Sequence, residues 1–381
     1  MNIFQPKFSV AILLLMPSFA LSHNLHNGVN IYPPAIQSGL SQVPFISGVA
    51  AVDGPRVQVI NESVWQWWYF DAVSSDGKSN FVISFFTISN LAFPFGGANL
   101  SSCVSVSISG TFSNGTSFAT GYLASEAVVI TVHDGSSGTW HGLVPLTDGP
   151  LGASEASAAW KGTPDMSVYT VTIDAPAAAI EGSLNLRSIA PAHYPCGPPS
   201  PNQTLQILPH VGWTNAVPDA SATANFSIAG SALTFSGPGY HDLAWSDTPF
   251  LDSVGGWYWG HGRLGNYSLV WWDARSAAGV EYVSHYVACE GRIVSAACAG
   301  LKVRPTGAND TYPPTLSSGV PRGFSVEMDL GGMGVLEVSL TAGLVTPDVP
   351  GFYARWTGVM EGGIKGGEML VGVALMEEFT V

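Results

Sequence analysis

The stretch 62–73 reads ESVWQWWYFDAV and places aromatic side chains on both sides of a predicted β-strand. Successive side chains of a strand point to opposite faces, so Trp65, Trp67 and Tyr69 share one face and the residues between them share the other. Bulky groups on both faces predict a central strand that is packed on both sides. For any single tryptophan in this stretch, packing in a core is the simpler interpretation than ligand binding.

The composition supports a large core built on β-sheet. The chain has 381 residues, of which 46% are hydrophobic and 10% charged, with 12 Trp, 12 Tyr and 18 Phe. This excludes a disordered chain and a coiled coil, and the aromatic residues suit sheet surfaces and apolar pockets. The net charge of −14 leaves no basic surface for phosphates, which argues against a nucleic-acid partner.

Further β-rich runs bounded by turn residues recur along the chain, at a spacing typical of antiparallel hairpins. The clearest are Phe81–Ser89, Cys103–Thr111, Ala127–Val132, Val168–Ile173, Ala222–Ile228, Tyr267–Asp273, Glu281–Val287, Phe324–Leu330 and Val335–Leu340. No long amphipathic window of helical period interrupts them, which disfavours a parallel sheet with crossover helices. We therefore predict an all-β fold.

Composition changes predict two domains. Residues 191–218 are rich in proline and are interpreted as a long irregular crossing, and a second change falls at residues 230–239. We expect an N-terminal extension at 23–44, a first β-sandwich or barrel at 45–235 and a second at 236–381. The second has the size of a small up-and-down barrel, whose interior can hold one apolar ligand.

Residues 1–22 have the pattern of a secretory signal peptide. Lys7 precedes an apolar run, and small residues follow at Ala20 and Ser22. Pro17 ends the run far short of a membrane span. We expect entry into the secretory pathway, a luminal or secreted product, and no stable membrane insertion after signal removal.

Sequons for N-glycosylation are numerous, as expected for a chain that passes a glycosylating compartment. They begin at Asn61, Asn99, Asn114, Asn202, Asn225, Asn266 and Asn309. Asn61 adjoins the aromatic run, where a glycan has the least room.

Cys103, Cys196, Cys289 and Cys298 lack the spacing of a zinc site and fit two disulfides in an oxidising lumen. Of three pairings, Cys103 with Cys196 and Cys289 with Cys298 is favoured. The short spacing of the second pair, with Gly291 between, suits neighbouring hairpin strands.

Several ionisable residues are candidates for acid–base chemistry. In the segment 237–245, GPGYHDLAW, His241 is the best candidate, because a neighbouring Asp242 can raise its pKa and orient its ring. Neighbours on a strand point to opposite faces, however, so each residue could instead satisfy local groups. Glu62 would have a raised pKa if it is buried against the aromatic run, and a solvated carboxylate is equally compatible.

Lys365 is an isolated cation in a glycine-rich strand near the C-terminus. If buried, it would hydrogen-bond a substrate carbonyl or pair with a carboxylate such as Glu62 or Glu368. An exposed lysine on an edge strand is the alternative.

Other motifs are less informative. Residues 260–265 spell G-x-G-x-x-G, but they run into the strand-like segment YSLVWWD rather than a helix, which excludes a dinucleotide fingerprint. His241, His261 and His285 match no metal-ligand spacing, so we expect no metal. No nucleophile elbow or Walker motif occurs.

Three segments resemble the carotenoid-hydratase-like superfamily, also called hydroxyneurosporene synthase or AttH-like. They are W-x-W-W-Y-F-D at 65–71, G-x-G-Y-H-D-x-x-W at 237–245 and W-Y-W-G with Y-x-L-V-x-W-D-A at 257–274. Within that superfamily the chain looks most like the fungal pericyclases, the Diels–Alderases of secondary metabolism. The resemblance implies two lipocalin-like antiparallel β-domains with a pocket between or beside them, and no cofactor.

The leader and the sequons point to a finer resemblance. They indicate the hetero-Diels–Alderases that join a tropolone quinone methide to a humulene-type sesquiterpene. The chain has Leu243, Ala244 and Ser246 where the common motif reads G-Y-H-D-H-N-W-G. These changes remove one histidine and argue against a water-activating role, while His241 and Asp242 are retained.

The resemblance implies that shape does most of the catalysis, since a cycloaddition gains most from a near-attack pose of two small apolar terpenoid or polyketide partners. Tyr240 and His241 would donate hydrogen bonds to a carbonyl, and His241 with Asp242, or Glu62, would supply a proton for a preceding dehydration. The expected aromatic walls of the pocket are Trp67, Trp68, Trp257, Trp271 and Trp356, together with Tyr240.

Two other functions remain open. A hydratase or isomerase of terpenoid or carotenoid alkenes would require a stronger acid, such as a second paired carboxylate. A lipocalin-like carrier of an apolar small molecule would need no acid. The sequence does not indicate the oligomeric state.

Overall fold

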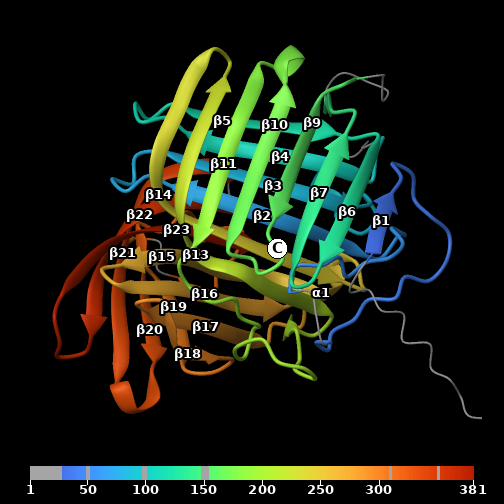
Figure 1. Ribbon diagram of the computed structural model, residues 1–381. Helices are drawn as coiled ribbons and strands as arrows, with labels where there is room; N and C mark the ends of the chain where they lie inside the picture. Colours follow the sequence, from blue (N-terminus) through green and yellow to red (C-terminus); the bar gives the residue numbers. More distant parts are fainter. Residues whose placement is uncertain (1–27, 49–51, 97–100, 147–153, 309–310, 350–351) are drawn as a thin grey trace, which may run out of the picture.

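The computed structural model describes residues 28–48, 52–96, 101–146, 154–308, 311–349 and 352–381. Its strands form two strongly curled antiparallel sheets (Figure 1), so the all-β prediction is confirmed. The one α-helix of the described residues is the short α1 (Phe250–Ser253). Three 3-10 turns, η1 (Pro94–Gly96), η2 (Pro176–Ala178) and η3 (Gly331–Met333), complete the helical elements there. The predicted signal peptide lies outside the described residues.

The first sheet contains fourteen strands in the order β1-β6-β7-β9-β10-β11-β13-β14-β2-β3-β4-β5-β8, with β12 paired to β13. The strands are β1 (Gly28–Tyr32), β2 (Trp65–Val73), β3 (Asn80–Ile88), β4 (Val104–Thr111), β5 (Ser117–Leu123), β6 (Glu126–Val132), β7 (Gly135–His141), β8 (Val144–Pro145), β9 (Ser157–Gly162), β10 (Val168–Ala175), β11 (Ile180–Ser188), β12 (Gln206–Leu208), β13 (Val211–Ile228) and β14 (Ser231–Ser246). The sheet curls, so β6 to β11 lie across β2 to β4 in Figure 1 and enclose a core rich in aromatic residues.

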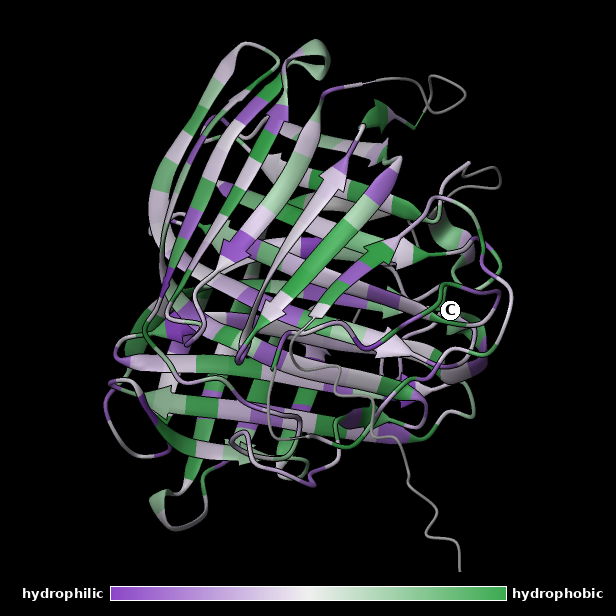
Figure 2. Ribbon diagram, turned by 45° about the vertical axis from the view of Figure 1, so that its right-hand side comes forward, coloured by the Kyte–Doolittle hydropathy of each residue, from purple (hydrophilic) through white to green (hydrophobic). Residues whose placement is uncertain are grey.

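The second sheet contains nine strands in the order β18-β17-β16-β15-β23-β22-β21-β20-β19. They are β15 (Val254–Leu264), β16 (Tyr267–Ser276), β17 (Glu281–Cys289), β18 (Arg292–Ala297), β19 (Leu301–Thr306), β20 (Gly323–Asp329), β21 (Val335–Val349), β22 (Tyr353–Ile364) and β23 (Leu370–Thr380). The sheet encloses its own core around Trp271, Phe324 and Trp356. The bands of contrasting hydropathy along the strands in Figure 2 reflect the alternation of core-facing and outward side chains.

A further core lies between the two sheets, and β2 packs on both sides as predicted. Trp68 and Phe70 belong to the core of the first sheet, whereas Trp65 and Tyr69 belong to the core shared with the second. From the second sheet, β15 contributes Trp259 to the shared core. The alternation of β2, β14 and β15 thus determines which side chains meet between the sheets.

The change from one sheet to the other occurs at residues 247–253, between β14 and β15. The expected boundary at 235/236 falls inside β14, all of which belongs to the first sheet. The segment 191–218 is only partly irregular, because β13 begins at Val211. Its Pro218 lies where the register between β13 and β14 shifts, so no ladder hydrogen bond from that position is needed.

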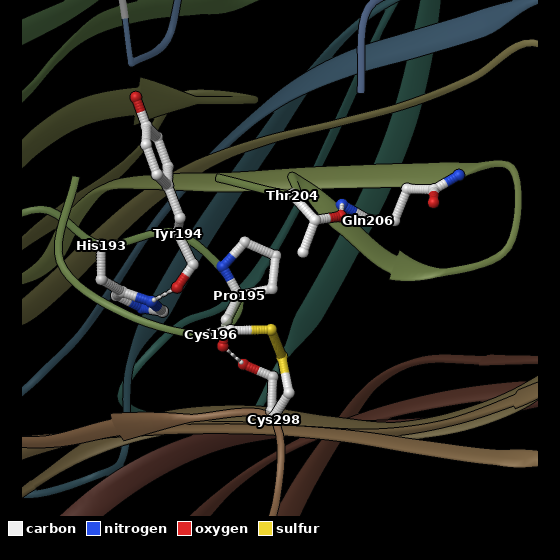
Figure 3. The surroundings of a disulfide bond; sticks show 8 residues. His193, Tyr194, Pro195, Cys196, Thr204, Gln206 and Cys298 are labelled. Atoms are coloured by element: carbon white, nitrogen blue, oxygen red, sulfur yellow. Dashed lines mark hydrogen bonds between the residues drawn. A yellow bond between two sulfur atoms is a disulfide. The ribbon is translucent and has the colours of Figure 1, made fainter. Parts of the chain in front are cut away.

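The predicted disulfide pairing is wrong. Cys196 pairs with Cys298, with 4.7 Å between their Cα atoms (Figure 3), whereas Cys103 and Cys289 are free. In the β17–β18 hairpin Cys289 lies opposite Arg292, at the turn, and Cys298 follows the far end of the hairpin. The observed disulfide ties the segment after β11 to the second sheet, and Cys103 is buried in the first core.

Candidate active site

A cavity of about 350 Å³ lies between the two sheets. The first sheet contributes side chains of β2 to β5, and the second contributes side chains of β15, β22 and β23. Its walls are largely aromatic and include Trp67, Phe86, Phe93, Phe95, Trp257 and Phe379. Such a cavity suits a flat or extended apolar ligand.

The cavity deepens into a pocket of about 30 Å³, which is large enough for one small polar group or a water molecule. Trp67, Tyr69, Trp257 and Glu377 line both spaces, so the deep pocket opens from the cavity. Asp242 of β14 is found at the deep pocket alone.

Asp242 is a buried carboxyl group, and only one of its two oxygens accepts hydrogen bonds from the described residues. Its Oδ2 accepts hydrogen bonds from Trp213 Nε1 at 2.7 Å and from the Tyr240 hydroxyl at 2.8 Å. Its Oδ1 has no hydrogen-bond partner among the described residues. Burial raises the pKa of Asp242 to about 7, against the opposing effect of these two hydrogen bonds. The group can therefore give or take a proton near neutral pH.

Four buried donors around Asp242 also lack partners within the described part of the chain. They are the Nε1 atoms of Trp257, Trp259 and Trp272 and the hydroxyl of Tyr69, and all four residues line the deep pocket. Buried polar groups in folded proteins are ordinarily hydrogen-bonded. So many unused donors beside an unused carboxyl oxygen indicate a place where a polar group of a ligand binds.

Tyr240 is held from a second side. Its ring stacks on His261 with 4.4 Å between the centroids, and His261 Nε2 lies 2.8 Å from Asp71 Oδ2. Tyr240 lies opposite Asp71 in the β14–β2 pair, so strand register brings these groups together. The stack fixes the hydroxyl that donates to Asp242.

An ion pair forms a second polar centre, on the wall of the cavity. Arg355 Nε donates to Glu377 Oε1 at 2.7 Å, and Arg355 Nη1 donates to Ser109 Oγ at 3.1 Å. The hydroxyl of Tyr353 donates to the same Glu377 oxygen at 2.7 Å. The guanidinium carbon also lies 5.3 Å from the centre of the Tyr69 ring, which joins this centre to the deep pocket.

Of the predicted site residues, Tyr240 and Asp242 lie between the sheets, but His241 points to the opposite face of β14. Its Nε2 lies 3.1 Å from Asp53 Oδ2, and its ring stacks on Phe70 at 3.8 Å. His241 is fully buried in the first core and does not reach the cavity. The alternation of β14 explains the separation of the two neighbours.

The other predicted residues are divided in the same way. Trp67 and Trp257 line the cavity, whereas Trp68 lies in the first core and Trp271 and Trp356 lie in the core of the second sheet. Two charged residues expected in the site lie at the surface. Glu62 is exposed before β2, and exposed Lys365 donates to Glu337 Oε1 at 2.8 Å.

Sequence reasoning missed Arg355, Glu377, Trp259 and Trp272. A signal for Arg355 was present, because in the segment YARWT at 353–357 alternation separates Tyr353 and Arg355 from the core-facing Trp356. Nothing in the sequence indicated that these residues of the second sheet would face β2.

The predicted glycosylation sites differ in exposure. Asn114, Asn202, Asn225 and Asn266 are exposed, whereas Asn99 and Asn309 lie outside the described residues. Asn61 is half-buried, and its Oδ1 accepts from the backbone N–H groups of Ser63 and Val64.

Among the described residues, no group of three or more His, Cys, Asp or Glu is arranged to hold a metal ion. No helix in this part of the chain is long and apolar enough to cross a bilayer.

Residues 41–311 match the family model described as Diels-Alderase-like. The chain belongs to the Diels-Alderase-like family. Its membership of this family identifies it as an enzyme. The resemblance to this family that the three aromatic segments predicted is confirmed. The quinolone epoxide rearrangement protein asqO of Emericella nidulans is 35% identical over 367 residues, covering 94% of this chain and 95% of that protein. The quinolone epoxide rearrangement protein penF of Penicillium thymicola is 35% identical over 359 residues, covering 92% and 95%.

A solved structure agrees with the fold of this Diels-Alderase-like chain. The crystal structure of CghA with Sch210972 has a TM-score of 0.73 at 18% identity and covers 93% of this chain and 98% of its own. At this identity the similarity concerns the fold alone. The names of the two relatives point to epoxide rearrangement, and neither names a tropolone cycloaddition.

Proposed function

We propose that this chain catalyses the acid-assisted rearrangement of an epoxide on a small molecule of the quinolone class. The two relatives at 35% identity support the substrate class, since both are named for quinolone epoxide rearrangement. One observation supports the reaction type most strongly. Asp242 has a pKa of about 7, lines the deep pocket and has one oxygen without a hydrogen-bond partner among the described residues.

In the proposed reaction, protonated Asp242 gives its proton to the epoxide oxygen. One C–O bond then breaks, and its electron pair stays on that oxygen. A neighbouring hydrogen or carbon group migrates with its bonding pair to the electron-deficient carbon. A carbonyl group forms as the hydroxyl proton returns to the Asp242 carboxylate, so the product is an isomer of the substrate. An acid with a pKa near the working pH is well matched to this double role.

The surroundings of Asp242 suit the charges that develop. The indole N–H groups of Trp259 and Trp272 have no partner among the described residues and can hydrogen-bond the oxygen as it gains negative charge. The rings of Trp67 and Trp257 line the same space and can stabilise the cationic carbon. A bound substrate would fill the space between the aromatic walls and leave little room for water beside the cation, which favours rearrangement over diol formation.

The hetero-Diels–Alder reaction between a tropolone quinone methide and a humulene-type sesquiterpene stays a prediction. Holding two partners together in the cavity would suffice for it. The buried acid and the names of the relatives favour epoxide rearrangement. A hydratase or isomerase of alkenes and a non-catalytic carrier stay as alternatives, and the carrier would leave Asp242 without a role.

The test is product analysis by liquid chromatography and mass spectrometry after the purified protein acts on a quinolone with a side-chain epoxide. We expect an isomer of unchanged mass from the wild-type protein and little from Asp242→Asn. Glu62→Gln is the matched control, because it also neutralises a carboxylate but lies at the surface. Loss of isomer formation in Glu62→Gln alone, or a diol as the main wild-type product, would contradict the proposal.

We also propose that the chain folds in the secretory pathway. The leader pattern at 1–22 supports this, and the Cys196–Cys298 disulfide is of a kind that persists in oxidising compartments. Expression of the full chain in a fungal host should give a product whose mobility increases on treatment with an N-glycosidase. An unshifted intracellular product would refute it.

A further inference from the structure

One face of the first sheet carries unusually small side chains beside the cavity. In β4, Ser105, Ser107 and Ser109 alternate with Val104, Val106 and Ile108, which point into the first core. Ser107 lies directly opposite Gly121 of β5, and Ser109 lies opposite Ala119. On the other side, Ser84 of β3 lies opposite Ser107. Small side chains of three adjacent strands thus form a platform, which is bordered by Phe86 of β3 and by Leu146, whose side chain lies over Gly121.

The platform is the floor of a groove of about 400 Å³ that continues the cavity. Phe86, Phe93 and Phe95 line both spaces, together with Ser107 and Ala119. Phe93 lies 6.4 Å from Phe86 and 5.2 Å from Phe95 between ring centres, so these rings form a wall beside the small residues. A slot between a flat floor and aromatic rings suits a planar ring better than a bulky aliphatic group.

The spaces follow one another in a fixed order. The deep pocket shares residues with the cavity, and the cavity shares others with the groove, but the deep pocket and the groove have none in common. A ligand that places a reacting group at Asp242 therefore directs its remote end toward the groove. Ser105 and Ser107 lie along the groove, and their hydroxyl groups suit the polar edge of a heterocycle.

We propose that this groove binds the planar heteroaromatic ring of the substrate, remote from the epoxide, and that Ala119 and Ser107 determine which rings fit. The proposal rests on the proposed function for the orientation of the substrate. The groove itself predicts the binding of a flat ring that carries no epoxide.

The test is isothermal titration calorimetry with an unsubstituted quinolone, which has the ring but not the reactive side chain. Ala119 is exposed and faces the groove, so Ala119→Trp fills the slot without entering a core. Ala232→Trp is the matched control, because Ala232 is an exposed alanine at the start of β14, and it is absent from the groove lining. We expect the ring to bind wild-type protein, Asp242→Asn and Ala232→Trp alike, and to bind Ala119→Trp at least about tenfold more weakly.

Equal binding to Ala119→Trp and wild-type protein would overturn the proposal, as would absence of binding to wild-type protein. Turnover of the quinolone epoxide separates this test from that of the proposed function. If the epoxide is rearranged but Ala119→Trp does not weaken binding of the ring, the groove assignment fails and the proposed function stands. If ring binding depends on Ala119 but no isomer forms, the function fails and the groove assignment stands. With both correct, Ala119→Trp raises KM and leaves kcat nearly unchanged.

Discussion

Replacing Asp242 with asparagine should stabilise the protein at alkaline pH while removing its activity. The substitution keeps the shape of the side chain and an oxygen that can accept from Trp213 and Tyr240. It removes a negative charge that burial disfavours. The gain in stability should therefore appear only at pH values where the carboxyl group is ionised in the unfolded wild-type protein.

The sign and size follow from the pKa of this group. Burial raises the pKa of Asp242 from 3.8 to about 7 in the folded protein. Between these values the folded state holds a proton that the unfolded state has released, so the wild-type protein loses stability as the pH rises. The difference between 3.8 and about 7 corresponds to about 4 kcal/mol. Asp242→Asn does not lose this stability, because the asparagine side chain does not ionise. The free energy of unfolding of the variant, minus that of the wild-type protein, should be small near pH 4, increase up to about pH 7 and stay constant above it.

Urea denaturation of wild-type protein and Asp242→Asn at a series of pH values measures the effect. Asp174→Asn is the control, because it also neutralises a carboxylate of a strand, but Asp174 is exposed rather than buried. A difference for Asp242→Asn that does not grow with pH would refute the reasoning, since the carboxyl group would then not be desolvated. A stabilised but inactive variant would show that the site retains this carboxyl at a cost in stability.

Three other outcomes are expected. Cys196→Ser removes a disulfide that joins residues separated by 102 positions in the sequence. Without reductant, it should lower the free energy of unfolding by about 2–5 kcal/mol. An unchanged free energy of unfolding would mean that the disulfide does not form. His241→Ala leaves the buried Asp53 without its histidine partner, so it should lower the free energy of unfolding by about 3–5 kcal/mol. The kcat of the folded fraction should stay nearly unchanged. A stable but inactive variant would show that His241 takes part in the reaction. Glu62→Gln and Lys365→Ala alter exposed side chains and should change stability by less than about 0.5 kcal/mol and activity little; a large loss of activity in either would place that residue in the site.

The sequence predicted the strands well because alternation is a local property. The aromatic stretch at β2 correctly indicated packing on both faces, and the same rule separated His241 from Tyr240 and Asp242 once the role of each face was known. The alternation of Ser105, Ser107 and Ser109 with core residues is also visible in the sequence, but the sequence does not show which strands lie on either side of them.

The sequence did not predict which strands, distant along the chain, pack against each other. Arg355 and Glu377 come from neighbouring strands of the second sheet, and only the packing of that sheet against β2 brings them near Tyr69. The disulfide pairing depended on the register of the β17–β18 hairpin, which places Cys289 at one end and Cys298 beyond the other. Sequence spacing alone does not determine that register.

The most direct test of the central claim is the pH dependence of epoxide rearrangement under saturating substrate, followed as isomer formed per enzyme. If protonated Asp242 is the acid, the wild-type rate is constant at acidic pH and falls about tenfold for each unit of pH above about 7. Asp242→Asn should lower the rate near pH 6 by about 10²–10⁴-fold and remove this dependence. A wild-type rate that stays flat from pH 6 to 9, or an Asp242→Asn variant with the wild-type rate, would contradict the account.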